Sequence, residues 1–87
     1  MYVKDVTVLN QVGLRARPAT FFTQKANEFK CSIWIEKEER RVNAKSLLGV
    51  LSLGVASGET IKIIADGNNE EAAAEALCTL ITSEFAG

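Results

Sequence analysis

The sequence predicts an α+β fold, an open two-layer sandwich in which helices cover one face of an antiparallel sheet, with elements in the order β-α-β-β-α-β-α. The first observation is that four segments alternate apolar and polar side chains with a period of two, as half-buried strands do. The second is that three other segments repeat apolar residues at helical spacing. The third is size: 87 residues, 47% of them hydrophobic, suffice for a core within a single domain, residues 1–87.

The first two elements are a strand and a helix. A strand is expected over residues 2–9, because Val6 and Val8 share one face of it. A helix is expected over residues 16–29, with Pro18 in its first turn, where a missing N–H costs nothing. Four apolar residues form the stripe that packs this helix on the sheet: Ala19, Phe22, Ala26 and Phe29.

The middle of the chain predicts a pair of antiparallel strands. Residues 32–37 alternate, with Ile33 and Ile35 on one face, and residues 40–44 can return beside them. The connection is Glu38-Glu39, which lacks the Gly or Asn that tight hairpin turns prefer. We therefore expect a looser turn at this position.

The second half of the chain adds a short helix over residues 46–53, a strand over residues 60–66 and a longer helix. Before the longer helix, Asn68 can form a capping box with Glu71, and Asn69 is a competing N-cap. Five apolar residues at helical spacing mark its buried face: Ala73, Leu77, Leu80, Ile81 and Phe85.

The two cysteines are too few for a disulfide scaffold. Cys78 lies beside the last apolar stripe and is expected in the core, whereas Cys31 precedes a strand and has no partner motif. The chain contains no apolar run of about 18 residues and no basic-then-apolar leader, so neither membrane insertion nor a signal peptide is expected. These features predict a soluble protein of the reducing cytoplasm.

Charge and composition exclude several function classes. A net charge of -1 argues against direct nucleic-acid binding. The chain has no histidine, which removes histidine-based acid–base chemistry, histidine metal ligands and phosphohistidine. The charge is unevenly spread, since residues 1–45 carry nine cations and five anions and residues 46–87 carry one and six. This split is either a matter of solvation or the mark of a basic face that recruits an acidic or phosphorylated partner.

The first segment with chemical potential is Gly-Leu-Arg-Ala-Arg-Pro-Ala at residues 13–19, where a strand leads into a helix. The start of a helix has unpaired N–H groups and the positive end of a dipole. Arg15 and Arg17 flank that start, so the segment can receive an anion such as phosphate or carboxylate. The alternative is two solvated arginines beside an ordinary helix cap.

The second segment is Val-Asn-Ala-Lys-Ser at residues 42–46 and the short helix after it. Ser46 is placed as the N-cap. A two-turn helix on a sheet cannot bury all of its apolar residues, so one group is expected to form an exposed patch for a partner: Leu47, Leu48 and Leu51. Phosphorylation of Ser46 would place about two negative charges at the helix N-terminus, a stabilising position, and beside this patch.

These two segments, together with Ser-Leu-Gly-Val at residues 52–55, closely resemble HPr, the small phosphocarrier family of the bacterial phosphoenolpyruvate-dependent sugar phosphotransferase system. The resemblance covers essentially the whole chain. It implies an open-faced sandwich with the four strands in the spatial order 1-4-2-3 and three helices. No catalytic activity of its own, no cofactor and no metal are implied.

The family motif is Gly-Leu-His-Ala-Arg-Pro, whose histidine accepts a phosphoryl group from enzyme I and passes it to enzyme IIA. This chain has Arg15 at the histidine position. A guanidinium offers donors only and has no lone pair with which to attack phosphorus. The carrier step is therefore expected to be lost, while a phosphate-binding site at Arg15, Ala16 and Arg17 is retained.

The resemblance also implies a regulatory role for Ser46. In Gram-positive members the corresponding serine is phosphorylated by HPr kinase/phosphorylase, and the phosphoprotein is a corepressor for the catabolite control protein CcpA. Crh, a paralogue in the family, likewise lacks the histidine, has glutamine there and keeps the serine. The residues implied at partner interfaces are Arg17, Thr20, Lys45, Leu47, Leu48 and Leu51.

Three hypotheses follow from the sequence. The first is a Crh-like regulatory protein controlled at Ser46, with HPr kinase/phosphorylase and a CcpA-type regulator as partners. The second is a phosphocarrier whose histidine was replaced by arginine at position 15. The third is a competitive binder that occupies enzyme I without accepting phosphate, and enzyme I and enzyme IIA are accordingly also candidate partners. A stand-alone enzyme is the least supported class, because no nucleophile–base pair or metal cluster is apparent.

Overall fold

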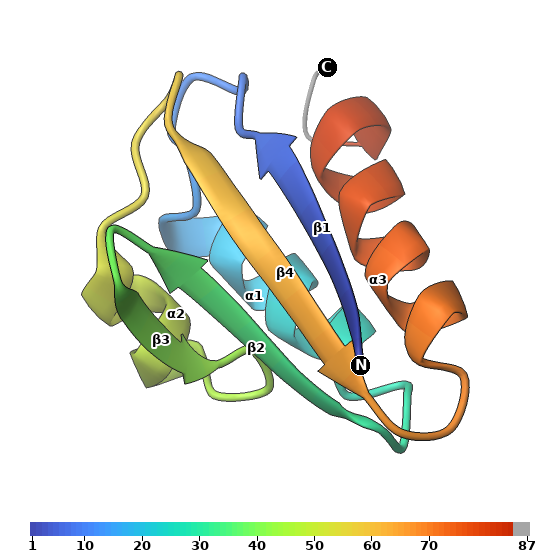
Figure 1. Cartoon of the computed structure of the whole chain (residues 1–87). Coiled ribbons are helices and arrows are strands. Elements are labelled where there is room, and N and C mark those ends of the chain that lie inside the picture. Colours follow the sequence, from blue (N-terminus) through green and yellow to red (C-terminus); the bar gives the residue numbers. More distant parts are fainter. Residues whose placement is uncertain (85–87) are drawn as a thin grey trace.

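The computed structural model describes residues 1–84, in which three helices cover one face of a four-stranded antiparallel sheet (Figure 1). The order of strands in the sheet is β1-β4-β2-β3, as the family resemblance implied. The strands are β1 (Tyr2–Thr7), β2 (Ser32–Lys37), β3 (Arg40–Asn43) and β4 (Thr60–Asp66). The helices are α1 (Ala16–Ala26), α2 (Leu47–Leu53) and α3 (Glu70–Thr79), and α3 continues as five residues of π-helix, η1 (Leu80–Glu84).

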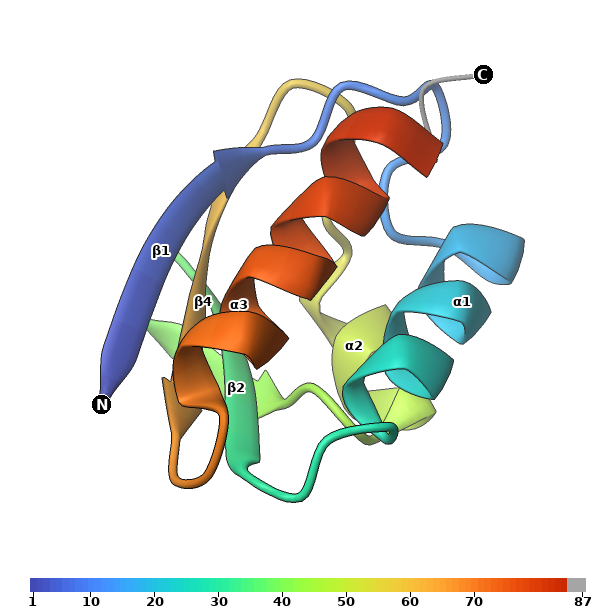
Figure 2. The ribbon, with the colours of Figure 1, turned by 90° about the vertical axis from the view of Figure 1, so that its right-hand side faces the viewer.

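The core lies between the sheet and the helices, and no element within residues 1–84 covers the other face of the sheet (Figure 2). The period of two along each strand creates this division, because alternate side chains point to opposite faces. The side chains that the helices cover are mostly apolar and buried. The largest members of this core include Phe22, Leu14, Ile33, Ile35, Ile61, Ile63, Leu77, Ile81, Val8 and Val50. The predicted architecture is thus confirmed over residues 1–84.

The ends of three elements differ from the sequence prediction, and the smallest difference is in β3, which ends at Asn43 rather than at residue 44. Strand β1 ends at Thr7 rather than at residue 9, although Val8 is still fully buried. Helix α1 ends at Ala26 rather than at residue 29. The side chain of Asn27 donates to the Thr23 carbonyl at 2.8 Å and to the Lys45 carbonyl at 3.1 Å. This side chain competes for the last helical carbonyls and stops the helix one turn early.

The turn between β2 and β3 is tight, so the expectation of a looser connection was wrong. Lys37 pairs directly with Arg40, which leaves only Glu38 and Glu39 to connect the strands. Both glutamates have positive φ angles, 49° and 69°. These angles are typical of the two-residue turns that match the twist of a hairpin, and they are usually taken by Asn and Gly. The pairing register of the strands outweighs the preference of the turn residues.

The start of α3 follows the second of the two alternatives that the sequence left open, the N-cap at Asn69. Asn69 is the N-cap, with φ 59° and no side-chain capping bond, and no capping box links Asn68 to Glu71. A capping side chain needs an extended backbone, which left-handed Asn69 does not have. The Glu70 carboxylate accepts the Gly67 N–H at 3.0 Å instead. The predicted buried stripe is confirmed for the members within residues 1–84, whereas Phe85 lies outside the described residues.

Candidate functional site

The loop before α1 is fixed by packing and by one backbone pairing. Leu14 is fully buried, and its N–H donates to the Val55 carbonyl at 3.0 Å. Gly13 has a φ of 64°, and a Cβ there would lie 2.1 Å from the Val55 oxygen. Only glycine allows this approach. The side chain of Asn10 closes the loop by donating to the Gly13 carbonyl at 2.9 Å.

This loop delivers two arginines to the start of α1. Arg15 is the N-cap, with an extended backbone and no side-chain capping bond, and Ala16 has a φ of 52°. Arg15 and Arg17 are exposed, and the first turn contains no acidic residue. The first-turn N–H groups and the positive end of the helix therefore face solvent between two guanidinium groups. The left-handed backbone at Ala16 costs about 1 kcal/mol, a kind of strain that often marks a functional site.

The positive field of Arg15 reaches one carboxylate on the neighbouring loop. The pKa of Glu59 is lowered first by a hydrogen bond from the Ala56 N–H and next by Lys37, and Arg15 contributes further. The N–H of Ala56 lies 2.6 Å from the Glu59 carboxylate, and the Lys37 ammonium lies 2.9 Å from it. Glu59 is thus held by its own neighbours, which leaves the Arg15 guanidinium available to a ligand.

Ser46 begins α2 as the sequence predicted. Its backbone is extended and its Oγ accepts the Gly49 N–H at 3.1 Å. A Cβ at residue 49 would lie 3.3 Å from this Oγ, so glycine keeps the space above Ser46 open. At the other end of the helix, the Lys37 ammonium donates to the carbonyls of Leu53 and Gly54, at 3.3 and 3.1 Å. Both ends of this short helix are therefore anchored.

The predicted division of the apolar residues of α2 is confirmed. Val50 and Leu53 are buried, whereas three leucines are left on the surface. The exposed fractions are 39% for Leu47, 81% for Leu48 and 38% for Leu51. We call these three residues the leucine patch. It follows Ser46 directly in the chain, so a phosphate on Ser46 would alter the charge beside it.

Lys45 and Thr20, two further residues that the family resemblance implies at partner interfaces, make contacts within the chain. The Lys45 ammonium donates to the Phe29 carbonyl at 2.6 Å. With the bond from Asn27 to the Lys45 carbonyl, this ties the end of α1 to the residue before Ser46. Thr20 Oγ1 donates to the Ala16 carbonyl at 3.4 Å, one turn into α1.

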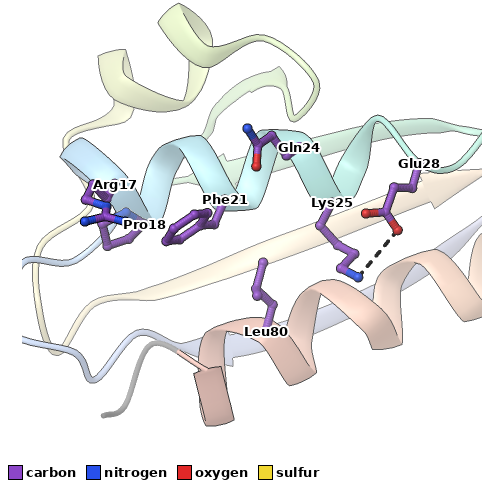
Figure 3. A pocket seen from close by; sticks show the side chains of 7 residues that line it. All are labelled: Arg17, Pro18, Phe21, Gln24, Lys25, Glu28 and Leu80. Atoms are coloured by element: carbon purple, nitrogen blue, oxygen red, sulfur yellow. Dashed lines mark hydrogen bonds and ion pairs between the residues drawn. The ribbon is translucent and has the colours of Figure 1, made fainter.

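Sequence reasoning missed a groove beside α1 (Figure 3). The groove holds about 560 Å³ and is lined by Arg17, Pro18, Phe21, Gln24, Lys25, Glu28 and Leu80. Phe21 is 42% exposed, and the Arg17 guanidinium carbon lies 5.6 Å from the centre of its ring. That distance is typical of a cation–π contact. The signal in the sequence was Phe21, the first phenylalanine of the pair 21–22, which the buried stripe does not use.

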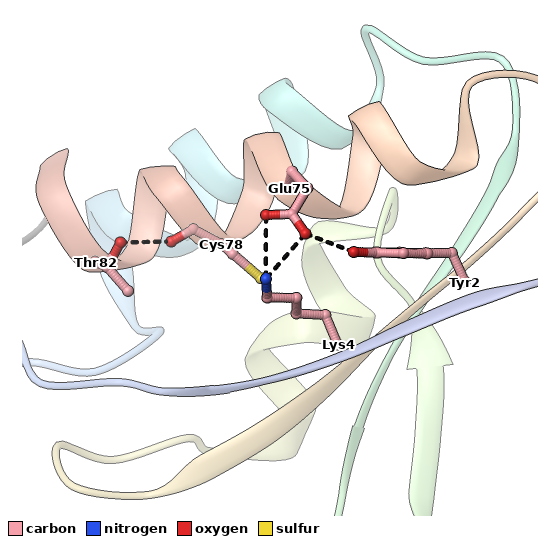
Figure 4. A network of polar contacts seen from close by, with 5 residues as sticks. All are labelled: Tyr2, Lys4, Glu75, Cys78 and Thr82. Carbon is pink, nitrogen blue, oxygen red and sulfur yellow. Dashed lines mark hydrogen bonds and ion pairs between the residues drawn. The ribbon is translucent and has the colours of Figure 1, made fainter.

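A polar cluster on the other side of the molecule holds α3 against β1 (Figure 4). The Glu75 carboxylate accepts the Tyr2 hydroxyl at 2.6 Å and the Lys4 ammonium at 2.9 Å. The Tyr2 and then the Lys4 hydrogen bonds lower the pKa of Glu75. Burial raises the pKa of the nearby Cys78 thiol. Cys31 and Cys78 are both buried free thiols.

The described part of the chain contains neither a cluster of metal ligands nor a membrane-spanning helix. Among residues 1–84, no group of three or more Cys, Asp or Glu side chains is placed to hold a metal ion. Within the same residues, no helix is long and apolar enough to cross a membrane.

Comparison with known proteins gives consistent matches. Residues 2–83 match the family model described as the PTS HPr component phosphorylation site. The chain is 49% identical to the HPr-like protein Crh of Halalkalibacterium halodurans over 84 residues, 97% of this chain and 100% of that protein. It is 39% identical to the phosphocarrier protein HPr of Neisseria meningitidis, covering 98% and 96% of the two chains. The crystal structure of an HPr from Thermoanaerobacter tengcongensis superposes with a TM-score of 0.96 at 45% identity, over 100% of this chain and 98% of that one.

Proposed function

Because the chain belongs to the HPr family of the bacterial sugar phosphotransferase system, we propose that it is a regulatory, Crh-like member controlled by phosphorylation of Ser46. The relatives of the chain include the phosphocarrier HPr and the HPr-like protein Crh, and both kinds are carriers or regulators rather than catalysts. The observation that carries the proposal is an intact Ser46 site beside a carrier site without a nucleophile.

The first support is the chemistry of Arg15. The carrier step needs a neutral imidazole nitrogen that attacks phosphorus, and a guanidinium is protonated at every physiological pH. The chain contains no histidine that could move into that position. Arg15, the Ala16 backbone and Arg17 keep the anion-receptive helix start. In our proposal this start binds an acidic or phosphorylated surface without itself receiving a phosphoryl group.

The second support is the environment of Ser46. The Oγ already accepts the Gly49 N–H, and the first turn of α2 contains no acidic residue that would repel a phosphate. HPr kinase/phosphorylase would transfer the γ-phosphoryl group of ATP to this oxygen. The Ser46 Oγ–phosphorus bond forms, the bond from phosphorus to the β,γ-bridging oxygen breaks, and the hydroxyl proton passes to a base of the kinase.

The third support is the surface around Ser46. The leucine patch offers apolar area, and Arg15 and Arg17 offer cations on the same helical layer. We propose that this surface, with phosphorylated Ser46, binds a CcpA-type regulator, and that the protein acts in the cytoplasm where those partners work. Thr20 would contribute from α1. Lys45 would contribute by holding the backbone before Ser46, since its ammonium is used on the Phe29 carbonyl.

Incubation with ATP and an HPr kinase/phosphorylase tests the proposal. One phosphate is expected, acid-stable and located on the peptide that contains Ser46. Ser46→Ala should abolish it, and Ser52→Ala, a control three residues from Gly49 in the same helix, should leave it unchanged. Absence of phosphate on folded wild-type protein, or its survival in Ser46→Ala, would refute the proposal.

A second candidate is a competitive binder of enzyme I or enzyme IIA, supported by the exposed Arg17 and the open start of α1. The chain should then slow phosphotransfer to an HPr that has its histidine, and failure to do so counts against this role. Arg15→His examines the remaining alternative, a carrier with a replaced histidine. Efficient phosphorylation of that variant by enzyme I would show that the carrier surface is retained.

A further inference from the structure

Figure 1 views the uncovered face of the sheet from the front. The strand register places four charged residues in one row across this face. The register pairs Asp5 with Lys62, Lys62 with Glu36, and Glu36 with Arg41. The row therefore crosses β1, β4, β2 and β3 with alternating charges, negative, positive, negative and positive. Within the chain, Lys62 lies 3.8 Å from Asp5, and Arg41 lies 3.1 Å from Glu36.

The next row on the same face is apolar at its centre. The register pairs Val3 with Ile64, Ile64 with Trp34, and Trp34 with Asn43. Ile64 is only 1% exposed although it lies on the open face, because the neighbouring side chains of this row flank it, whereas Val3 is 47% exposed. Trp34 is half-buried. Tryptophan is the residue type most enriched at the centres of protein interfaces.

We propose that this open face is a self-complementary interface that binds the same face of a second copy of the chain. A two-fold axis parallel to the strands, between two facing sheets, keeps each row opposite itself and reverses the strand order. Asp5 then faces Arg41 of the second copy, and Lys62 faces Glu36 of the second copy. All four charges of the row meet opposite charges, and so do the four of the second copy.

The same two-fold axis also places the apolar row opposite itself, so that its apolar side chains face one another. Ile64 of each copy faces Trp34 of the other, and Val3 faces Asn43. Facing sheets pack about 10 Å apart, a distance that the long side chains of Lys62, Glu36 and Arg41 can bridge from both sides. Ion pairs between neighbouring strands of one chain already make the charges alternate. Across four strands, the same alternation also makes the row complementary to itself under this symmetry, and this self-complementarity points to a second copy as the occupant.

The area of the open face determines how strongly two copies are expected to associate. Four strands about 4.8 Å apart, of 6, 7, 6 and 4 residues across the sheet, give a face of roughly 20 by 20 Å. Two such faces bury roughly 800 Å² before the relief of the side chains is counted, which is the range of weak and transient interfaces. The dimer should therefore form at high protein concentration and weaken with added salt, because its ion pairs lie near solvent.

Charge exchange between the two outer strands tests the proposal. In Asp5→Lys, residue 5 would face Arg41 of an identical partner with like charge. In Arg41→Glu, residue 41 would face Asp5 with like charge. Each variant alone should associate on the order of tenfold more weakly than wild type, and an equal mixture should regain wild-type affinity. In the mixed dimer both facing pairs are of opposite charge, while each chain keeps whatever internal defect its substitution causes.

Sedimentation equilibrium at roughly 1 mM protein, where so small an interface is expected to associate, gives the association constants. Trp34 is the single tryptophan and reports through its fluorescence whether it enters the interface. The matched control is a mixture of Glu28→Lys and Lys30→Glu, which makes the same changes in net charge away from the open face. Circular dichroism shows whether each variant is folded. If a variant of the outer strands is unfolded, the pair Lys62→Glu and Glu36→Lys repeats the test on the two central strands.

Recovery in the Asp5→Lys and Arg41→Glu mixture, without recovery in the control mixture, supports the interface. A wild-type chain that stays monomeric at this concentration overturns it. A dimer whose affinity does not change when the charges are exchanged also overturns it. Such a dimer indicates another mode of association, such as exchange of β1 between copies. Equal recovery in both mixtures overturns it as well, because it shows only attraction between net charges.

Discussion

Replacement of Ser46 is the perturbation whose effect on stability follows most directly from the geometry. Ser46→Ala removes the oxygen that accepts the Gly49 N–H at 3.1 Å and leaves that donor without its cap. Ser46→Asp keeps an acceptor at the same position and adds a negative charge. Since the first turn of α2 contains no acidic residue, this charge meets the positive end of the helix without repulsion.

The magnitudes come from the cap and from the helix charge. Loss of a serine N-cap costs about 1 kcal/mol of unfolding free energy. A carboxylate at the N-terminus contributes about 0.3–1 kcal/mol at low salt. We therefore expect Ser46→Ala to be less stable than wild type by about 1 kcal/mol, which lowers Tm by roughly 4–8 °C for a chain of this size. Ser46→Asp should be at least as stable as wild type.

Urea unfolding followed by circular dichroism at pH 7 measures these differences, provided that the slope of the transition is the same in all three proteins. The carboxylate of Ser46→Asp stabilises the fold only when ionised, so its pKa is lowered in the folded state. Its advantage should be present above the ordinary aspartate pKa of about 3.9 and should disappear as the pH falls below it. An alanine variant as stable as wild type, or an aspartate variant less stable than alanine at pH 7, would contradict this reasoning.

Three further outcomes are expected. Replacing Glu38-Glu39 by Asn-Gly should raise the unfolding free energy by about 1 kcal/mol or more, because both φ angles are positive; an unchanged denaturation midpoint would refute this. Glu75→Gln should be less stable than wild type at pH 7, and this difference in unfolding free energy should shrink as the pH falls from about 4.5 through the lowered pKa of Glu75. A difference that does not depend on pH would contradict the role of Tyr2 and Lys4 as partners of an ionised carboxylate. Leu48→Ser should change stability by less than about 0.5 kcal/mol, since the side chain is largely exposed, yet weaken binding of the phosphorylated protein to a CcpA-type regulator; unchanged binding in a titration would exclude Leu48 from that interface.

The sequence carried enough information to predict the layers of the fold because its apolar periodicity is strong. Val6 and Val8, the stripe of α1 and the leucines of α2 fell on the sides that the spacing indicated. The order of the strands came from the family resemblance, since periodicity does not say which strands are neighbours. Element ends were less predictable, because α1 stops where Asn27 finds the Lys45 carbonyl, a partner from another part of the chain.

The turn at Glu38-Glu39 and the start of α3 show the limit of local rules. At Glu38-Glu39 the backbone is left-handed at residues that rarely take that conformation, and the register of β2 with β3 imposes it. At Asn69 the left-handed backbone falls on a residue type that accepts it readily, and it is this backbone that excludes the side-chain cap. The capping pattern at Asn68 and Glu71 was a sound local prediction, but the Glu70 carboxylate and the Gly67 N–H outcompeted it. Tertiary contacts routinely override such propensities.

The candidate site was predictable in its residues but not in its surroundings. Arg15, Arg17, Ser46 and the leucine patch stood out because their residue types and spacing carry chemistry. The use of the Lys45 ammonium on the Phe29 carbonyl, and the groove beside Phe21, were not predictable, since both depend on how α1 lies against its neighbours. Likewise, a buried Ile64 on the open face follows from the register of three strands.

The most direct test of the central claim offers the folded chain each phosphoryl donor alone and then both together, phosphoenolpyruvate with enzyme I and ATP with HPr kinase/phosphorylase, and maps the phosphate by mass spectrometry before and after acid treatment. A serine ester survives acid, whereas a phosphate on nitrogen does not. The account predicts one acid-stable phosphate, on Ser46, that requires ATP. An acid-labile phosphate that requires phosphoenolpyruvate, on Arg15 or elsewhere, or the absence of any phosphate on Ser46, would contradict it.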